Sequence, residues 1–162
     1  MTIFKTHRRA FSGAIALAGL AVAATAQAQP SAETFTFTSQ ANSEVSVGSD
    51  GTGPNPYFAA YVTGTFTTAF AGGENVNGNY TCISMTQPPA GKIFDFHMLC
   101  DGTDSRGTYS ITMGCTVLDS ATNDWSCIGG IYGKSGGYSG KRGTLTNHSV
   151  GGEASGTGQW YR

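Results

Sequence analysis

The sequence is poor in charge, in proline and in long apolar runs. Only 12% of its 162 residues are charged, with nine Lys and Arg against ten Asp and Glu, and it contains five prolines. Binding to a phosphate backbone needs clustered basic side chains. Beyond residue 28 the chain has a single adjacent basic pair, Lys141-Arg142, which we interpret as ordinary solvated surface. We therefore expect no nucleic-acid partner.

Several catalytic and metal-binding motifs are also missing. The chain has no G-x-S-x-G elbow, no nucleotide-binding loop and no metalloprotease motif. Its four cysteines form no C-x-x-C pair, and no histidine stands at ligand spacing from them. We accordingly predict neither a metal site nor a cofactor, and no redox-active cysteine pair.

Residues 1–28 have the pattern of a secretory signal peptide. A basic stretch that includes Arg8-Arg9 precedes a mild apolar run over residues 14–26, which ends in an A-x-A cleavage site. The run is too short to span a membrane. The arginine pair resembles the twin-arginine export motif, and a general secretory signal is the alternative. We predict an exported protein, periplasmic or secreted, with a single domain over residues 29–162.

The four cysteines all lie beyond the predicted signal peptide, as expected for an oxidising compartment. Cys82 and Cys100 are symmetric about Gly91, which lies in a turn sequence, and Cys115 and Cys127 are symmetric about a second turn sequence. Each pair would face its partner across an antiparallel hairpin, within disulfide reach. We predict the disulfides Cys82–Cys100 and Cys115–Cys127, each stabilising the fold by roughly 2–4 kcal/mol.

The remainder of the chain alternates between short β-forming runs and turn sequences, with no convincing helix, internal repeat or linker. The runs are residues 34–38, 43–47, 57–70, 78–86, 92–100, 106–118, 125–133, 139–146 and 153–161. They amount to about eight strands. This pattern predicts an all-β fold, an antiparallel closed barrel of about eight strands, with a β-sandwich as the alternative.

The alternation of side chains predicts which residues face the interior. Between Thr108 and Val117 every second residue is apolar and the others are Ser, Thr or Gly, so the apolar set faces the core. The outward Thr and Ser also argue against an outer-membrane barrel. Hairpin symmetry extends the inner face to neighbouring strands. The predicted lining is Tyr80, Phe94, Phe96, Met98, Tyr109, Met113 and Trp125.

Two pairs of side chains could carry catalysis. Asp95 and His97 share one face of a strand and could form a general-base dyad, but that face is opposite Phe96, so we prefer a surface position. His148 and Glu153 flank the last turn, where they could hold the polar end of a ligand, a solvated turn being the alternative. Tyr109 offers an inward hydroxyl. The catalytic residue, if there is one, is otherwise unknown.

Glycines crowd the last thirty residues, where they are typical of bends and close backbone approach in a curling sheet. The run Gly136, Gly137, Tyr138, Gly140, Gly143 and Thr144 is followed by a glycine-rich final strand over residues 156–160. This stretch resembles the C-terminal signature of the allene oxide cyclase/dirigent barrel superfamily.

The resemblance implies an eight-stranded antiparallel barrel around a hydrophobic cavity. Members of the superfamily cyclise fatty-acid epoxides, steer radical coupling of phenols or close polyketide rings, without a cofactor, by confining a reactive substrate. No catalytic residue of the superfamily has a matching motif here.

Three functions follow. The first is an exported barrel that binds a small hydrophobic or aromatic molecule, the second is a cofactor-free cyclase or isomerase, and the third is a secreted interaction or inhibitor module. An interior filled by the predicted lining would exclude the second, and an exposed apolar patch would favour the third. The sequence does not indicate an oligomeric state.

Overall fold

The computed structural model describes residues 32–48, 57–87 and 92–161, and the predicted signal peptide lies outside them. The described chain forms eight strands and one short 3₁₀ helix. These elements are β1 (Glu33–Gly48), β2 (Phe58–Phe70), β3 (Asn75–Thr86), β4 (Phe96–Asp104), β5 (Gly107–Asp119), β6 (Asp124–Gly133), η1 (Gly136–Tyr138), β7 (Arg142–Val150) and β8 (Glu153–Tyr161). Among the described residues, no helix has the length and apolar character needed to cross a membrane.

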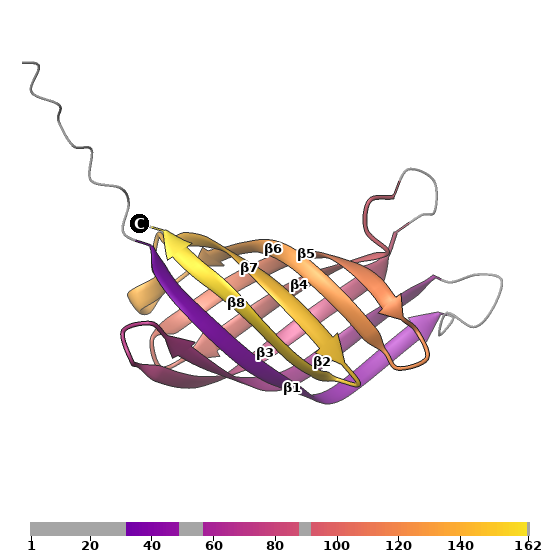
Figure 1. The fold of residues 1–162 in the computed structure, drawn as a ribbon, viewed down its shortest axis with the longest axis horizontal. Coiled ribbons are helices and arrows are strands. Elements are labelled where there is room, and N and C mark those ends of the chain that lie inside the picture. The colour runs from indigo at the N-terminus through magenta and orange to yellow at the C-terminus, as the bar shows by residue number, and fades with distance from the viewer. Residues whose placement is uncertain (1–31, 49–56, 88–91, 162) are drawn as a thin grey trace, which may run out of the picture.

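The sheet closes on itself. Each strand pairs in antiparallel fashion with its neighbours in sequence, and β1 also pairs with β8, from Glu33 opposite Trp160 to Gln40 opposite Glu153 (Figure 1). The predicted all-β, antiparallel, eight-stranded closed barrel is therefore confirmed. The sandwich alternative is excluded because one continuous sheet includes every strand.

Both predicted disulfides are present. Cys82 lies directly opposite Cys100 in the pairing of β3 with β4, and Cys115 lies opposite Cys127 in the pairing of β5 with β6. The Cα atoms are 4.0 and 4.1 Å apart, and all four residues are buried. The hairpin symmetry of the sequence thus located both bonds, which fasten neighbouring strands to each other on the inner face of the barrel.

A register shift in β1 changes which residues face inward. The segments predicted as two short runs form one strand, whose pairing with β2 is irregular between Ala41 and Ser43. A bulge of this kind adds one residue to one strand and therefore reverses the alternation beyond it. Phe35 lies in the core before the shift, whereas Glu44 lines the interior after it. Val45 is consequently directed outward and is 66% exposed.

The glycine-rich final strand β8 makes room for aromatic rings. The ring of Phe37 lies against Gly156, and the ring of Phe35 lies against Gly158, so closely that a Cβ atom at either glycine would overlap the ring. Both phenylalanines lie on β1 directly opposite these glycines in the pairing of β1 with β8. The glycines therefore allow large inward side chains at the seam where the barrel closes.

One end of the barrel is closed by an aromatic plug, which consists of Tyr109, Tyr138 and Trp160. The helix η1 carries Tyr138 into this end, where it is 1% exposed. Its ring stacks on Trp160 at a centroid distance of 4.9 Å and meets Tyr109 edge to face at 5.2 Å. Residues 139–141, predicted to begin a strand, instead follow η1, and β7 starts at Arg142.

Paired charges surround the aromatic plug. The Arg106 guanidinium lies 4.1 Å from the centroid of the Phe70 ring and donates to both carboxylate oxygens of Glu33, at 3.0 and 3.1 Å. Lys141 Nζ also donates to Glu33, at 3.1 Å. Burial alone would raise the pKa of Glu33, but the hydrogen bonds from Lys141 and Arg106 outweigh it and hold that pKa below its usual value.

The opposite end has no such plug among the described residues, and we call it the open end. β1, β3, β5 and β7 end there, and β2, β4, β6 and β8 begin there, because the strands alternate in direction around the barrel (Figure 1). The first residue of β1 and the last described residue of β8 lie at the closed end. Since the aromatic plug blocks the closed end, a molecule in solvent would reach the interior from the open end.

Candidate functional site

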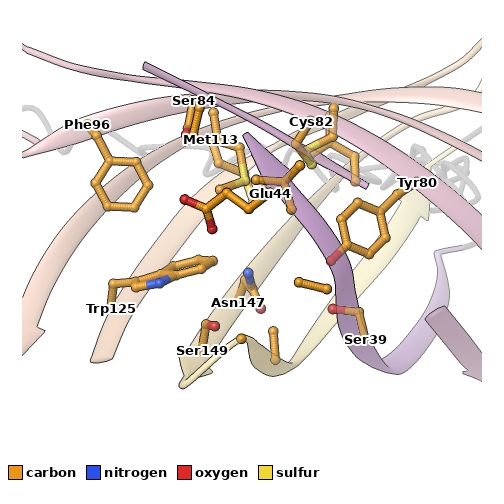
Figure 2. A pocket seen from close by; sticks show the side chains of 18 of the residues that line it. Ser39, Glu44, Tyr80, Cys82, Ser84, Phe96, Met113, Trp125, Asn147 and Ser149 are labelled. Carbon is orange, nitrogen blue, oxygen red and sulfur yellow. A yellow bond between two sulfur atoms is a disulfide. The ribbon is translucent and has the colours of Figure 1, made fainter. Parts of the chain in front are cut away.

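The barrel contains a cavity of about 610 Å³. It lies between the aromatic plug and the open end, and all eight strands contribute to its wall (Figure 2). Its apolar residues include Phe35, Val62, Phe96, Met113, Trp125 and Leu145. Preformed ligand sites have volumes of about 300–1,000 Å³ and mostly apolar walls. The interior is therefore large enough for a small molecule.

Most of the predicted lining residues lie in this wall. They are Tyr80, Phe96, Met98, Tyr109, Met113 and Trp125. The space between them persists because small inward residues stand among the large ones, such as Ala60 on β2, Ser84 on β3 and Ala154 on β8. The predicted side chains thus surround a void rather than fill it.

Phe94, in contrast, lies outside the cavity. Its ring covers Gly114, on the outer face of β5, and meets the ring of His97 edge to face at 5.6 Å. The prediction assumed that alternation continued back from Phe96, but β4 begins at Phe96 and the two preceding residues form a bend. The expected inward position of Phe94 is corrected for this reason.

Asp95 and His97 do not form a dyad. The Asp95 carboxylate lies at the rim of the cavity, where it accepts hydrogen bonds from Lys92 Nζ at 2.6 Å and from the backbone N–H of Val117 at 2.9 Å. The hydrogen bond from Lys92, followed by that from Val117, lowers the pKa of Asp95. His97 is exposed and packs against Phe94. His97 thus has the surface position preferred for the pair. Asp95 does not, because the bend before β4 interrupts the alternation and places its carboxylate at the cavity rim.

His148 and Glu153 also lie outside the cavity. Both side chains are exposed on the outer surface, and His148 Nε2 is 2.8 Å from Asp124 Oδ1. The inward residues of β7 are their neighbours, Asn147 and Ser149. The pair is therefore not positioned to hold a ligand in the cavity, since the alternation of the strands turns it toward solvent.

Tyr109 lies at the deep end of the cavity, as part of the aromatic plug. Burial, with a smaller contribution from the nearby Asp104 carboxylate, raises the pKa of Tyr109. Its ring packs edge to face against Trp160 at 5.9 Å as well as against Tyr138. This packing makes Tyr109 part of the floor of the site.

Five of the uncharged polar side chains that line the cavity project from three sides of its wall. Figure 2 shows Asn147 and Ser149 of β7 on one side, Ser84 of β3 on the other, and Tyr80 and Ser39 along a third. Burial raises the pKa of Tyr80, so its phenol stays protonated at neutral pH. Tyr80 leans over Gly64, where a Cβ atom would overlap its ring.

Asn147 has no hydrogen-bond partner for its side-chain oxygen among the described residues. The residue is 7% exposed and lines the cavity. Its two neighbours across the sheet are Cys127 and Gly156, and neither has a hydrogen-bonding side chain, since Cys127 is in a disulfide. Buried amide groups are almost always hydrogen-bonded in native proteins, so this one is an exception that calls for a cause.

The charged side chains of the described wall are Glu44, Lys92 and Asp95, and they lie toward the open end. Glu44 comes from the part of β1 beyond the register shift, and Figure 2 shows its carboxylate directed into the cavity. The deeper wall is apolar or uncharged. A ligand that matches this distribution has an apolar body and few polar groups.

The outer surface of β1–β4 carries a contiguous apolar patch beside the open end. Register places Val45, Tyr61, Ile83 and Leu99 in one row across the four strands. Each is 49–66% exposed. A second row contains Val47, Ala59, Met85 and His97. We use the name outer patch for the six large, exposed apolar residues of the two rows, which are Val45, Val47, Tyr61, Ile83, Met85 and Leu99.

The row on the other side of the outer patch is polar: it consists of Ser43, Thr63, Thr81 and Asp101. The patch therefore has a sharp polar boundary on the side of the closed end. Sequence reasoning missed it because the register shift in β1 has no clear signal in the sequence. The shift turns Val45 outward and leaves Val47, which also borders the cavity at its rim, 68% exposed. Glu44 was missed for the same reason.

The described residues contain no group of three or more His, Cys, Asp and Glu placed to hold a metal ion. The chain matches no protein-family model and no curated protein.

Proposed function

We propose that this barrel binds a small apolar or aromatic molecule in its central cavity. The observation that supports the proposal is an open cavity of about 610 Å³ with an apolar wall and isolated polar groups. The aromatic plug and the two disulfides fasten the strands around the void, so the site exists before a ligand enters. Preorganisation of this kind lowers the cost of binding.

A filled cavity tests the proposal. Ala60 is 5% exposed and directed inward, whereas the adjacent Ala59 is directed outward in the second row of the outer surface. We expect Ala60→Phe to reduce binding of the apolar fluorophore N-phenyl-1-naphthylamine at least tenfold, because the new ring occupies the ligand volume. Ala59→Phe, which adds the same ring outside, should bind it like the wild type.

Fluorescence titration gives both affinities, and circular dichroism checks that each variant is folded. Equal affinity of Ala60→Phe and the wild type would show that the fluorophore binds elsewhere. Native mass spectrometry of the protein from its own source should reveal a bound small molecule in the wild type and none in Ala60→Phe.

Membership of the allene oxide cyclase/dirigent superfamily and export from the cytoplasm belong to the same proposal. The closed eight-stranded barrel with a cavity supports the first, since it is the architecture that the resemblance implies. The two disulfides support the second, because such bonds persist in oxidising compartments. The intact mass of the mature protein tests export: we expect it to begin near Gln29, and a mass that includes residues 1–28 would contradict it.

A cofactor-free cyclase or isomerase is the second candidate function. The observation that favours it is the set of polar groups around a real void, with Glu44, Tyr80 and Asn147 coming from three different strands. Confinement of a reactive substrate in one conformation can supply several kcal/mol of catalysis. We expect the ligand found by mass spectrometry to be converted to an isomer of the same mass by the wild type and not by Ala60→Phe. Recovery of the unchanged ligand would leave binding as the function.

The outer patch favours a third candidate, an interaction module whose partner is a second copy of this chain. Together the six side chains expose on the order of 600 Å², close to the roughly 800 Å² that each partner of a standard interface buries. The patch contains no charged side chain, and its polar boundary row contains one, Asp101. Two copies facing each other across a two-fold axis would therefore meet without like charges in the centre.

Analytical ultracentrifugation tests the pairing. We expect a concentration-dependent dimer for the wild type and a monomer for Ile83→Lys, because an ammonium group would be buried at the centre of the interface. Thr144→Lys is the matched control, since Thr144 is exposed on the outer face of β7, away from the patch. A wild type that stays monomeric up to high micromolar concentration would refute the second copy as the partner.

A further inference from the structure

The side-chain amide of Asn147 contributes no hydrogen bond from its oxygen to the described part of the barrel. Its carbonyl oxygen is buried and has no donor among the described residues. Along β7 its inward neighbours are Leu145 and Ser149, and across the sheet they are Cys127 and Gly156. An apolar side chain at this position would avoid the cost of an unsatisfied amide.

The amide stands halfway along an otherwise apolar part of the wall. Leu145 lies below it toward the aromatic plug, and the ring of Phe37 covers the neighbouring Gly156. The charged groups of the described wall, in contrast, lie near the open end. A ligand that enters from the open end and reaches Leu145 must therefore pass its body along Asn147, the polar group nearest to that depth on β7.

The chemistry of an amide selects the partner. It presents a carbonyl acceptor on one side and an N–H₂ donor on the other, and rotation about its terminal bond exchanges the two. A hydroxyl both donates and accepts, so it satisfies the amide in either orientation, whereas an ether or ketone oxygen only accepts. Tyr80 and Ser39 project from another part of the wall and offer further hydroxyl groups to a ligand, and the phenol of Tyr80 stays protonated.

We infer that the molecule bound in this cavity is a hydroxylated apolar compound whose hydroxyl group is hydrogen-bonded by the Asn147 side chain. This inference rests on the proposed binding function and specifies its ligand class. It assigns Asn147 to recognition of the ligand rather than to stability of the barrel. The inference also implies that the barrel binds a hydroxylated compound more tightly than a hydrocarbon, ether or ketone of the same shape.

Three probes of one shape test the inference: 2-naphthol, 2-methoxynaphthalene and naphthalene. Isothermal titration calorimetry at pH 7 should show that the wild type binds 2-naphthol about fivefold or more tightly than the other two, the size expected for one net hydrogen bond. Asn147→Leu should bind all three with similar affinity, because it keeps the volume of the side chain and removes the amide.

A second readout separates recognition from a structural role. Without ligand, Asn147→Leu should unfold at a urea concentration equal to or higher than the wild type, since the empty protein gains nothing from the amide. The control Thr146→Val changes the adjacent outward residue of β7 and should keep the preference for 2-naphthol. A clear loss of stability in Asn147→Leu would overturn the inference in favour of a structural amide.

The outcomes also separate this inference from the proposed function. If the wild type binds the three probes equally, ligand binding stands and the hydroxyl preference is refuted. If Asn147→Leu retains the preference for 2-naphthol, another group recognises the hydroxyl and the assignment of Asn147 is refuted. If the wild type binds neither N-phenyl-1-naphthylamine nor any of the three probes, the proposed function is refuted and the inference is refuted with it.

Discussion

The two ends of the barrel differ in how their buried polar groups are paired. At the closed end, Glu33 accepts hydrogen bonds from Arg106 and Lys141, and the Tyr138 hydroxyl donates to Asp104 at 2.7 Å. In the open half, the oxygen of Asn147 is buried without a partner. Native proteins accept unsatisfied groups mainly at functional sites. At the closed end Arg106 Nη1 is also buried without a hydrogen bond, but it lies 3.6 Å from a carboxylate oxygen of Glu74, which compensates its charge. The difference indicates that the closed end stabilises the fold and that the open half is arranged for an occupant.

Packing shows the same contrast. The aromatic plug is solid, with Tyr138 stacked on Trp160 and both nearly inaccessible to solvent, at 1% and 2% exposure. The open half surrounds a cavity of about 610 Å³, and Trp125 in its wall is only partly buried. The chain contains two tryptophans, one in each half. This distribution provides a direct comparison of the two ends by mutation.

The largest effect is expected from the aromatic plug. Trp160→Ala should reduce the free energy of unfolding by about 3–5 kcal/mol, the usual loss when a large buried aromatic side chain is truncated. Trp125→Ala should cost roughly half of that or less, since Trp125 already borders empty space. Urea denaturation measures both. Equal losses would show that the two ends contribute alike to stability and would remove the contrast.

The disulfides are expected to have the next largest effect. They fasten β3 to β4 and β5 to β6 from the inside, where the cavity leaves little core packing to hold the strands. We expect Cys82→Ala/Cys100→Ala to cost roughly 2–4 kcal/mol, and the same change at Cys115 and Cys127 to cost slightly less because its loop is shorter. The loops span 18 and 12 residues.

Hydrogen exchange shows where that stability is lost. Without either disulfide, the amides of the open half should exchange faster while those around Trp160 and Tyr138 keep their protection, because the aromatic plug does not depend on the cysteines. Uniformly faster exchange in both halves would instead mean that the barrel opens only as a single unit.

Much of the barrel could be predicted from the sequence because its signals are local. Turn sequences and period-two alternation delimited the strands, and the symmetry of Cys82 and Cys100 about one turn located a disulfide. The predictions failed where regularity is interrupted. Phe94 precedes the start of β4, and the shift near Ala41 reverses the faces of β1.

The void itself could not be predicted, since it depends on side chains from strands far apart in sequence. Whether an interior is filled is decided by the sum of inward volumes around the whole barrel, and small residues such as Ala60 and Ala154 become significant only when the pairing is known. Asn147 was missed for a related reason. Alternation with Leu145 marks it as inward, but the lack of a partner follows only from Cys127 and Gly156 beside it.

The smallest expected effect concerns acid and the ion pairs of the closed end. Hydrogen bonds from Lys141 and Arg106 hold the pKa of Glu33 below its ordinary value of 4.5 despite the opposing effect of burial. The unfolded chain therefore binds this proton more readily than the folded protein. The stabilisation is present above about pH 4.5 and is lost as the pH falls through the lower pKa of the folded state.

Glu33→Gln should accordingly lower the free energy of unfolding at pH 7 by about 1 kcal/mol or less, because the Glu33 side chain is 36% exposed and solvent weakens the ion pairs. The difference from the wild type should shrink below pH 4. Glu153→Gln at the open end removes the same charge from the exposed outer surface and serves as the control. A difference between wild type and Glu33→Gln that stays constant from pH 7 to pH 3 would mean that Glu33 stabilises the closed end through packing rather than through its charge.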